Sequence, residues 1–248
     1  MSERHIFRLK GADTLSFLQG LVTNDVQKLS DGLVYAALLT PQGKYLADFF
    51  LVPEQDAVLL DADASQADML RTRLTMYQLR ADVVIEDTDL HLHRGLGDAP
   101  DDGFADPRHA EMGWRAYRDA AQTEDGVDWT ARRVAHLIPK TGVELTPDTF
   151  ILEARFEALH GVDFRKGCYV GQEVTARMKH KTTLRKGLAH VSVTGDACAG
   201  DAITKEGKPV GTLLSRAGDN AIAYLRFERA QGEMQAGEAQ VIWDQSGN

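Results

Sequence analysis

Two apolar runs joined by a short turn constrain the fold of this chain more than any other feature. Residues 35–40 and 45–52 are mostly hydrophobic, and Pro41-Gln42-Gly43-Lys44 connects them. Proline and glycine stand where a tight turn of four residues needs them, so the segment predicts a β-hairpin. We therefore expect the first part of the chain to be organised on an antiparallel sheet.

The segments around this hairpin alternate between strand-like and helix-like patterns. Residues 15–22 and 64–78 carry apolar side chains at helical spacing, which predicts two helices. Three further short runs predict strands at residues 4–9, 57–61 and 82–86. This order favours an α+β fold in which helices pack on one face of a mostly antiparallel sheet.

The last quarter of the chain has a different pattern, because short apolar runs alternate there with glycine. Such spacing predicts a small antiparallel β-barrel. Its expected strands are residues 188–193, 201–205, 208–215, 221–225 and 239–243. We expect an α+β region over residues 1–182, with an internal break at the acidic surface loop 95–113, and the barrel over residues 183–248.

Composition limits the class of protein. With 43% hydrophobic and 26% charged residues, the chain has the composition of a soluble globular protein. No apolar run approaches the ~20 residues that span a bilayer, and the first residues lack the apolar core of a secretory signal. We expect a cytoplasmic monomer without membrane partners, and a net charge of −9 argues against general nucleic-acid binding.

The stretch from Phe164 to Gly187 is basic within this acidic chain. It holds seven lysine and arginine residues and one acid, Glu173. Cys168 lies there between Gly167 and Gly171, so we expect the cysteine on a turn. Neighbouring cations favour a thiolate, which can bind metal or attack an electrophile. The alternative is a buried, inert cysteine that packs as a small hydrophobic residue.

The cysteine count limits what metal chemistry is open to the chain. Cys168 and Cys198 are the two cysteines, and they do not form a Cys-x-x-Cys pair. Two thiolates cannot supply the four that usually hold an iron–sulfur cluster. Any cluster bound here would therefore share a ligand, Cys168, with another protein.

The motif Lys166-Gly167-Cys168-Tyr169-Val170-Gly171-Gln172-Glu173, followed by Ala176-Arg177, resembles the signature of the YgfZ family of folate-binding proteins. Residues 17–20 and 23–25 are similar to a second family element. This family includes the mitochondrial iron–sulfur assembly factor of the same descent, and it is related to the T-protein of glycine cleavage, an aminomethyltransferase. The resemblance implies a T-protein-like folate-binding fold, a C-terminal barrel, and a role in assembling or repairing [4Fe-4S] proteins.

The resemblance also implies candidate site residues. Asp48 interrupts an apolar strand, so it either faces solvent or is poised in a pocket, where a carboxylate could manage a proton on a folate nitrogen. Glu153 could pair with the amino edge of a pterin. Asn24-Asp25 is either a helix stop or the edge of a ligand pocket. The folate contacts implied are Asn24, Asp25, Asp48, Glu153, Lys166, Tyr169, Gln172, Glu173 and Arg177, and the candidate catalytic residues are Cys168 and Asp48.

Three functions fit these residues. We favour a folate-binding accessory protein, with tetrahydrofolate as ligand and iron–sulfur carrier or client proteins as partners, in which Cys168 is a transient cluster ligand or a redox thiol. A tetrahydrofolate-dependent aminomethyl or methyl transferase would use Asp48 and would not need Cys168. An anion- or RNA-binding module would use the basic stretch, and it fits an older description of the family as tRNA-modifying.

Overall fold

The computed structural model describes residues 3–181 and 183–245. The chain divides into two compact units. The first comprises the described part of residues 1–126 together with residues 157–176, and the second comprises residues 127–156 and the described part of residues 177–248. Residue 182, where the predicted domain boundary falls, lies outside the described residues.

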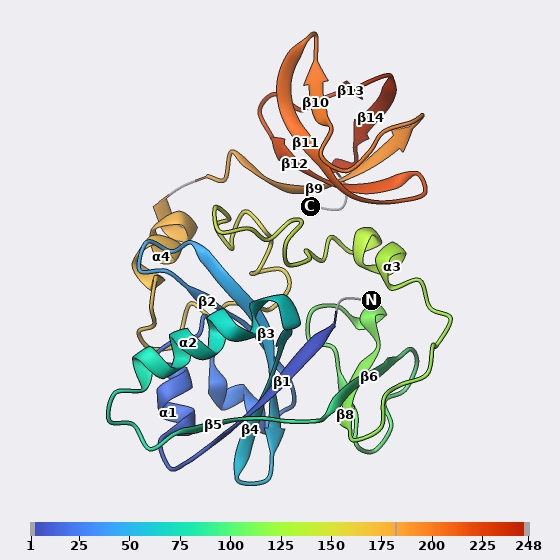
Figure 1. Cartoon of the computed structure of the whole chain (residues 1–248). Coiled ribbons are helices and arrows are strands. Elements are labelled where there is room, and N and C mark those ends of the chain that lie inside the picture. Colours follow the sequence, from blue (N-terminus) through green and yellow to red (C-terminus); the bar gives the residue numbers. More distant parts are fainter. Residues whose placement is uncertain (1–2, 182, 246–248) are drawn as a thin grey trace. The chain divides into compact units, whose positions relative to one another are not determined.

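The first unit is built on a five-stranded antiparallel sheet in the order β2-β3-β4-β1-β5 (Figure 1). The predicted hairpin is confirmed as the β2-β3 pair, joined by the turn at residues 40–44. The strands are β1 (Arg4–Lys10), β2 (Val34–Leu39), β3 (Tyr45–Glu54), β4 (Ala57–Asp63) and β5 (Val84–Asp87).

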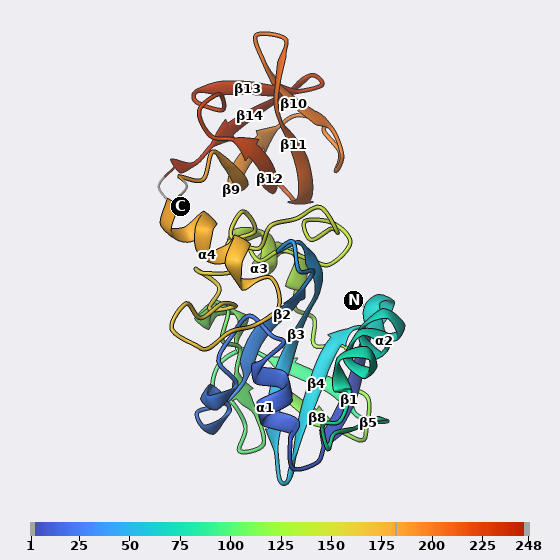
Figure 2. The same cartoon turned by 90° about the vertical axis from the view of Figure 1, so that its left-hand side faces the viewer.

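Two helices, α1 (Thr14–Gln19) and α2 (Ala67–Gln78), cover one face of this sheet (Figure 2). Leu18, Leu70 and Leu74 of these helices are fully buried in one cluster with sheet residues such as Phe49 and Leu60. Burying each such side chain contributes about 1.5–3 kcal/mol, which explains why the apolar stripes of both helices turn toward the sheet. Short 3-10 helices lie at η1 (Val26–Ser30), η2 (Ala64–Gln66) and η3 (Ala110–Met112).

A second sheet in this unit has three strands in the order β6-β8-β7. Its strands are β6 (His91–Gly95), β7 (Phe104–Ala105) and β8 (Trp114–Arg118). The prediction of a plain surface loop over residues 95–113 was wrong in part, because this stretch contains β7 and η3 and buries Asp106 and Met112. Asp106 can be buried because arginine side chains surround it, as described below.

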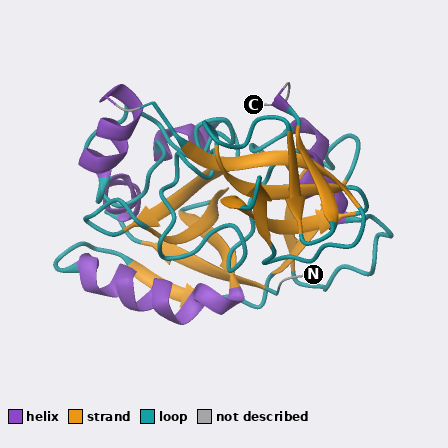
Figure 3. Cartoon of the chain, turned by 90° about the horizontal axis from the view of Figure 1, so that it is seen from above, coloured by secondary structure: helices purple, strands orange, loops and turns teal. Residues whose placement is uncertain are grey.

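The second unit contains α3 (Trp129–Ala135) and a closed six-stranded barrel. Across the described part of the chain, strands are more numerous than helices (Figure 3). The barrel order is β10-β11-β12-β9-β14-β13, which confirms the predicted architecture. Its strands are β9 (Lys186–Thr194), β10 (Ala202–Lys205), β11 (Lys208–Ala217), β12 (Asn220–Arg226), β13 (Glu233–Ala236) and β14 (Ala239–Trp243).

One helix was not predicted from the sequence. This helix, α4 (Gln172–Lys181), begins directly after Gly171, and three basic residues, Lys179, His180 and Lys181, occupy its last turn. Positive charge there complements the negative end of the helix dipole. None of the helices in the described part of the chain has both the length and the apolar character needed to cross a membrane.

Candidate functional site

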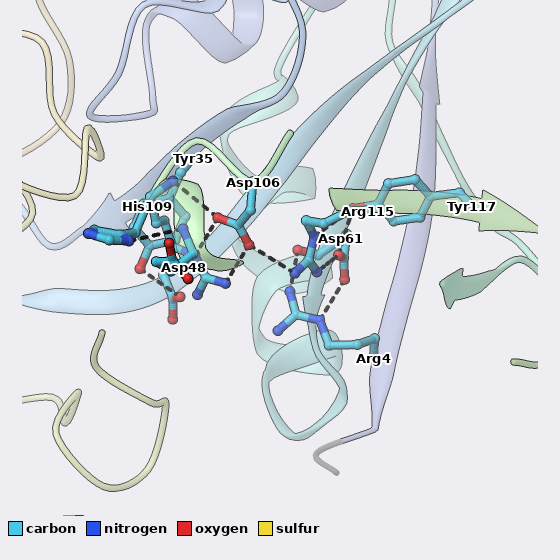
Figure 4. A network of polar contacts seen from close by, with 10 residues as sticks. Arg4, Tyr35, Asp48, Asp61, Asp106, His109, Arg115 and Tyr117 are labelled. Atoms are coloured by element: carbon cyan, nitrogen blue, oxygen red, sulfur yellow. Dashed lines mark hydrogen bonds and ion pairs between the residues drawn. The ribbon is translucent and has the colours of Figure 1, made fainter. Parts of the chain in front are cut away.

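Asp48 lies on the face of the large sheet that is turned away from α1 and α2. Side chains alternate along β3, so Ala47 and Phe49 join the helix-facing core while Asp48 and Phe50 point to the other face. Asp48 is only 7% exposed. The Tyr35 hydroxyl donates to its Oδ2 at 3.0 Å (Figure 4). The Tyr45 hydroxyl donates to its Oδ1 at 2.6 Å.

A register shift brings Tyr45 to the same face as Asp48. Strict alternation along β3 would place these two side chains on opposite faces, because they are three residues apart. The pairing with β2 shifts between Leu38 and Leu39, so that Leu38 faces Ala47 but Leu39 faces Tyr45. The extra residue in β3 at this irregularity, Leu46, reverses the alternation, and the second tyrosine therefore reaches the carboxylate.

The two hydroxyls present Asp48 as a hydrogen-bond acceptor. Burial raises the pKa of Tyr35 well above its ordinary value, and the nearby Asp48 carboxylate raises it further. The phenol therefore keeps its proton and donates a hydrogen bond to the carboxylate. An acidic group fixed in this way can accept an N–H or exchange a proton with a bound nitrogen heterocycle.

Asp61 lies on the same sheet face, paired with Phe50 across β3 and β4, and is fully buried. Arg4 Nε donates to its Oδ1 at 2.6 Å, and Arg115 and the Tyr117 hydroxyl donate to its Oδ2 at 2.5 and 2.8 Å (Figure 4). Burial alone would raise the pKa of Asp61, but Arg4 and Arg115 hold it below its usual range. The carboxylate therefore stays charged and ties β1, β4 and β8 together.

Asp106, which directly follows β7, extends this network. Arg108 donates to both of its carboxylate oxygens, at 3.0 and 2.7 Å, and an Arg115 nitrogen lies 3.5 Å from it. Both guanidinium groups lie over the Phe50 ring, at 4.7 and 3.8 Å from its centre. Asp61, Asp106, Arg108 and Arg115 were not among the candidate site residues predicted from the sequence, although Asp61 interrupts an apolar strand just as Asp48 does.

Asn24 and Asp25 are engaged with the protein itself. The buried Asn24 amide donates to the carbonyls of Tyr35 and His160, at 2.8 and 2.7 Å, and its oxygen accepts from the Asp25 backbone and from Lys28. The Asp25 carboxylate caps η1 by accepting from the Gln27 backbone N–H. Asn24 therefore holds the segment before the cysteine motif against β2, whereas Asp25 serves the local structure of η1.

Lys166 and Tyr169 of the motif are buried, with 7% of each exposed. The Lys166 ammonium donates to the backbone carbonyls of Gln19, at 2.8 Å, and Val22, and it lies 5.0 Å from the centre of the Tyr169 ring. Burial lowers the pKa of Lys166 to about 8, against the opposing effect of Asp25 and Asp163. Burial likewise raises the pKa of Tyr169 to about 12.

Cys168 has the opposite environment. It is a free, exposed cysteine between these two buried residues. An added Cβ at the neighbouring Gly167 would meet no atom within 4 Å, so another molecule can approach the backbone closely here. In α4, Gln172 is half-buried, whereas Glu173 and Arg177 are exposed at a spacing of four residues, which puts them on one side of the helix.

Glu153 belongs to the second unit and is also engaged. The Tyr224 hydroxyl donates to its Oε2 at 2.7 Å, and the Lys186 ammonium lies 3.7 Å from its Oε1. Its backbone carbonyl accepts from the Leu188 N–H at 2.8 Å. Glu153 therefore anchors its part of the second unit to strands β9 and β12 of the barrel.

Comparison with solved structures supports the predicted fold. The glycine cleavage system aminomethyltransferase T from Bartonella henselae superposes with a TM-score of 0.78 and 15% identity, covering 100% of this chain and 84% of that protein. The family model described as the CAF17 C-terminal β-barrel domain matches residues 185–246. The T-protein-like fold with a terminal barrel is confirmed, whereas identity this low says nothing of activity.

Curated relatives match over most of the chain. The mouse mitochondrial iron–sulfur cluster assembly factor IBA57 is 30% identical over 96% of this chain and 80% of its own length. The human protein of the same name is 29% identical over 93% and 78%. A homologue from Mycosarcoma maydis is 33% identical over 76% of this chain, which spans only 55% of that relative. These matches confirm the resemblance drawn from the cysteine motif, and the chain belongs to the family of IBA57 iron–sulfur cluster assembly factors.

Proposed function

We propose that this protein assists the assembly or repair of [4Fe-4S] proteins, with the Cys168 thiol as the group that contacts the cluster. The observation that carries the proposal is the exposed thiol of Cys168 between two buried residues of the same motif. Curated relatives that share most of this chain are named iron–sulfur cluster assembly factors. A thiol exposed on an otherwise anchored segment suits brief contact with the cluster of another protein.

The cluster is cargo in this proposal and is shared between proteins. The described residues contain no group of three or more histidine, cysteine, aspartate or glutamate side chains able to hold a metal ion. Cys168 would therefore supply one ligand while a carrier or client protein supplies the others. The protein purified alone without oxygen should hold no stable cluster, and a stoichiometric cluster on the isolated chain would contradict the shared-ligand model.

Tetrahydrofolate is the second ligand that we propose, with Asp48 as its main polar contact. The donor chemistry fits, because a buried carboxylate oriented by two tyrosine hydroxyls can accept an N–H from a pterin. Asn24, Asp25, Glu153 and Lys166 bind protein groups instead, so a folate contact through them would require those bonds to break. Titration calorimetry with tetrahydrofolate should show binding that Asp48→Asn weakens at least about tenfold.

The decisive test uses a host that lacks its own homologue. Activity of a [4Fe-4S] enzyme such as aconitase is measured after complementation with the wild-type chain or with Cys168→Ser. We expect the wild type to restore activity and Cys168→Ser to fail, at equal protein levels. Cys198→Ser is the matched control, because that cysteine is also free and exposed but lies in a barrel loop. Equal rescue by Cys168→Ser would reject the thiol as the working group.

The second candidate function is a folate-dependent aminomethyl or methyl transferase. The fixed Asp48 carboxylate favours it, because this reaction needs a group that handles a proton on folate nitrogen. It predicts that Asp48→Asn abolishes transferase activity while Cys168→Ser leaves that activity intact, whereas the first proposal makes Cys168 indispensable. The cytoplasmic location and the monomeric state stay predictions, and the mouse and human relatives are described as mitochondrial.

A further inference from the structure

The cysteine loop, defined here as residues 163–171, is fixed at its beginning by a buried lysine. The Lys166 ammonium donates to the carbonyls of Gln19, the last residue of α1, and of Val22, three residues further along the chain. Carbonyls at the C-terminal end of a helix lack partners within the helix and carry partial negative charge, so they attract a cation. Lys166 is only 7% exposed, and its side chain therefore anchors the loop from inside the protein.

The backbone just before Lys166 is held to the same region. The Asp163 N–H donates to the Thr23 carbonyl at 3.0 Å, and the Thr23 hydroxyl donates to the Gly161 carbonyl at 2.7 Å. The Asp163 carboxylate accepts from the Lys166 N–H at 3.1 Å and pairs with Lys28 at 2.7 Å. Polar contacts at Gly161 and Asp163 therefore fix the chain a few residues before the exposed Cys168.

The end of the loop is fixed by two glycines that touch. Gly171 and Gly43 both have positive φ, at 83° and 74°. A Cβ on Gly171 would lie 2.6 Å from the Thr40 carbonyl oxygen and 3.2 Å from the Gly43 Cα, and a Cβ on Gly43 would lie 2.8 Å from Val174. The loop therefore ends in direct backbone contact with the β2-β3 turn, where no larger residue fits.

From this geometry we propose that Lys166 is a positioning residue for Cys168, which holds the thiol at a set place by anchoring the loop to the end of α1. Cys168 lies two residues after Lys166 and three before Gly171. Since successive Cα atoms are about 3.8 Å apart, the cysteine Cα stays within roughly 8 Å of the first anchor and 12 Å of the second. A cluster ligand supplied to another protein benefits from such restraint, because less conformational freedom is lost on contact.

This inference rests on the proposed role of Cys168, so its test needs one readout that does not depend on cluster chemistry. A nitroxide label on Cys168, in a Cys198→Ser background, reports by electron paramagnetic resonance how freely the loop moves. Lys166→Met keeps the length and apolar stem of the side chain and removes its donors. We expect at least about tenfold faster amide exchange over residues 163–171 and a narrower, more mobile nitroxide spectrum.

Arg8→Met is the matched control, because Arg8 also donates two hydrogen bonds, to both oxygens of Glu54, from β1. It should leave the nitroxide spectrum and the rescue of [4Fe-4S] enzyme activity unchanged, whereas Lys166→Met should lower that rescue several-fold. Lys166→Arg, which retains donors, should restore part of it. If Lys166→Met fails to fold, Gly171→Ala disturbs the second anchor and should mobilise the label in the same way.

The outcomes separate the two proposals. An unchanged spectrum and unchanged amide exchange in Lys166→Met would overturn the positioning role, whatever Cys168→Ser does. A mobile label together with full rescue by Cys168→Ser would reject the proposed function but leave the anchoring of the loop established. A mobile label, weaker rescue by Lys166→Met and no rescue by Cys168→Ser would support both.

Discussion

The Asp48 face of the sheet and the cysteine loop use buried charge in different ways. On this face arginines neutralise Asp61 and Asp106, and tyrosine hydroxyls donate to Asp48 and Asp61. In the cysteine loop, a buried cation binds neutral backbone carbonyls and leaves the neighbouring thiol exposed. The first region fixes the Asp48 carboxylate through donors that bind the carboxylate itself. The second fixes the Cys168 thiol through Lys166, which holds the neighbouring backbone.

The largest expected effect is on the first region. Arg115→Met removes a cation that contacts both Asp61 and Asp106, and removing one partner of a buried pair typically costs about 3–5 kcal/mol. Urea unfolding should show this loss as a lower midpoint. Arg118→Met is the matched control in the same strand, since its pair with Asp102 is exposed, and its midpoint should not change. Equal midpoints for both variants would show that the network is not a source of stability.

Acid should weaken the same region. The pKa of Asp61 and that of Asp106 lie below the usual 3.8, because their arginine partners outweigh burial. A lowered folded pKa means that the stabilisation is complete above about pH 4 and is lost as pH falls through the folded value. As the pH falls through this range, the free energy of unfolding should drop by up to about 1.4 kcal/mol per pH unit for each extra proton that the unfolded chain binds. In Asp61→Asn the slope should be smaller, and an unchanged slope would contradict this assignment.

An intermediate effect is expected where a hydroxyl donates to Asp48. Tyr45→Phe removes one hydrogen bond to a buried carboxylate, which costs about 1.5–3 kcal/mol. Tyr77→Phe, at a half-buried tyrosine of α2, is the comparison and should cost less. Urea unfolding of the two variants measures the difference. A loss no greater in Tyr45→Phe than in Tyr77→Phe would mean that Asp48 does not depend on this donor.

The smallest effect on stability belongs to the residue with the largest proposed effect on function. Cys168→Ser changes an exposed side chain, so the free energy of unfolding should stay within about 0.5 kcal/mol of the wild type. Thermal and urea unfolding check this directly. A clear loss of stability would show that the thiol supports the fold, and failed rescue by this variant would then lose its functional meaning.

The sequence indicated Asp48 but not its surroundings. An aspartate inside an apolar strand is visible locally, whereas its partners come from distant positions, and Tyr45 reaches it only through the register shift beside Leu39. Asp61 carries the same local signal and was overlooked because no motif marked it. Arg108 lies in a stretch rich in glycine and proline, where composition favoured a surface loop and gave no sign of a buried ion pair.

Lys166 shows the same limit in the cysteine motif. Read along the chain, it was one of several cations in a basic stretch and was expected to contact folate. The structure buries it against carbonyls that lie more than a hundred residues earlier in the sequence. A charged residue beside glycines looks the same in sequence whether it faces solvent or a helix end, since no periodicity distinguishes these cases.

By itself the sequence determined the hairpin, the helices that cover the sheet and the terminal barrel, because apolar periodicity and turn residues are local properties. The tertiary structure alone decided which charges meet in the interior, which face Tyr45 occupies, and which motif residues are buried beside the exposed thiol. Those outcomes depend on contacts between segments far apart in the chain, where desolvation and pairing are settled only after packing.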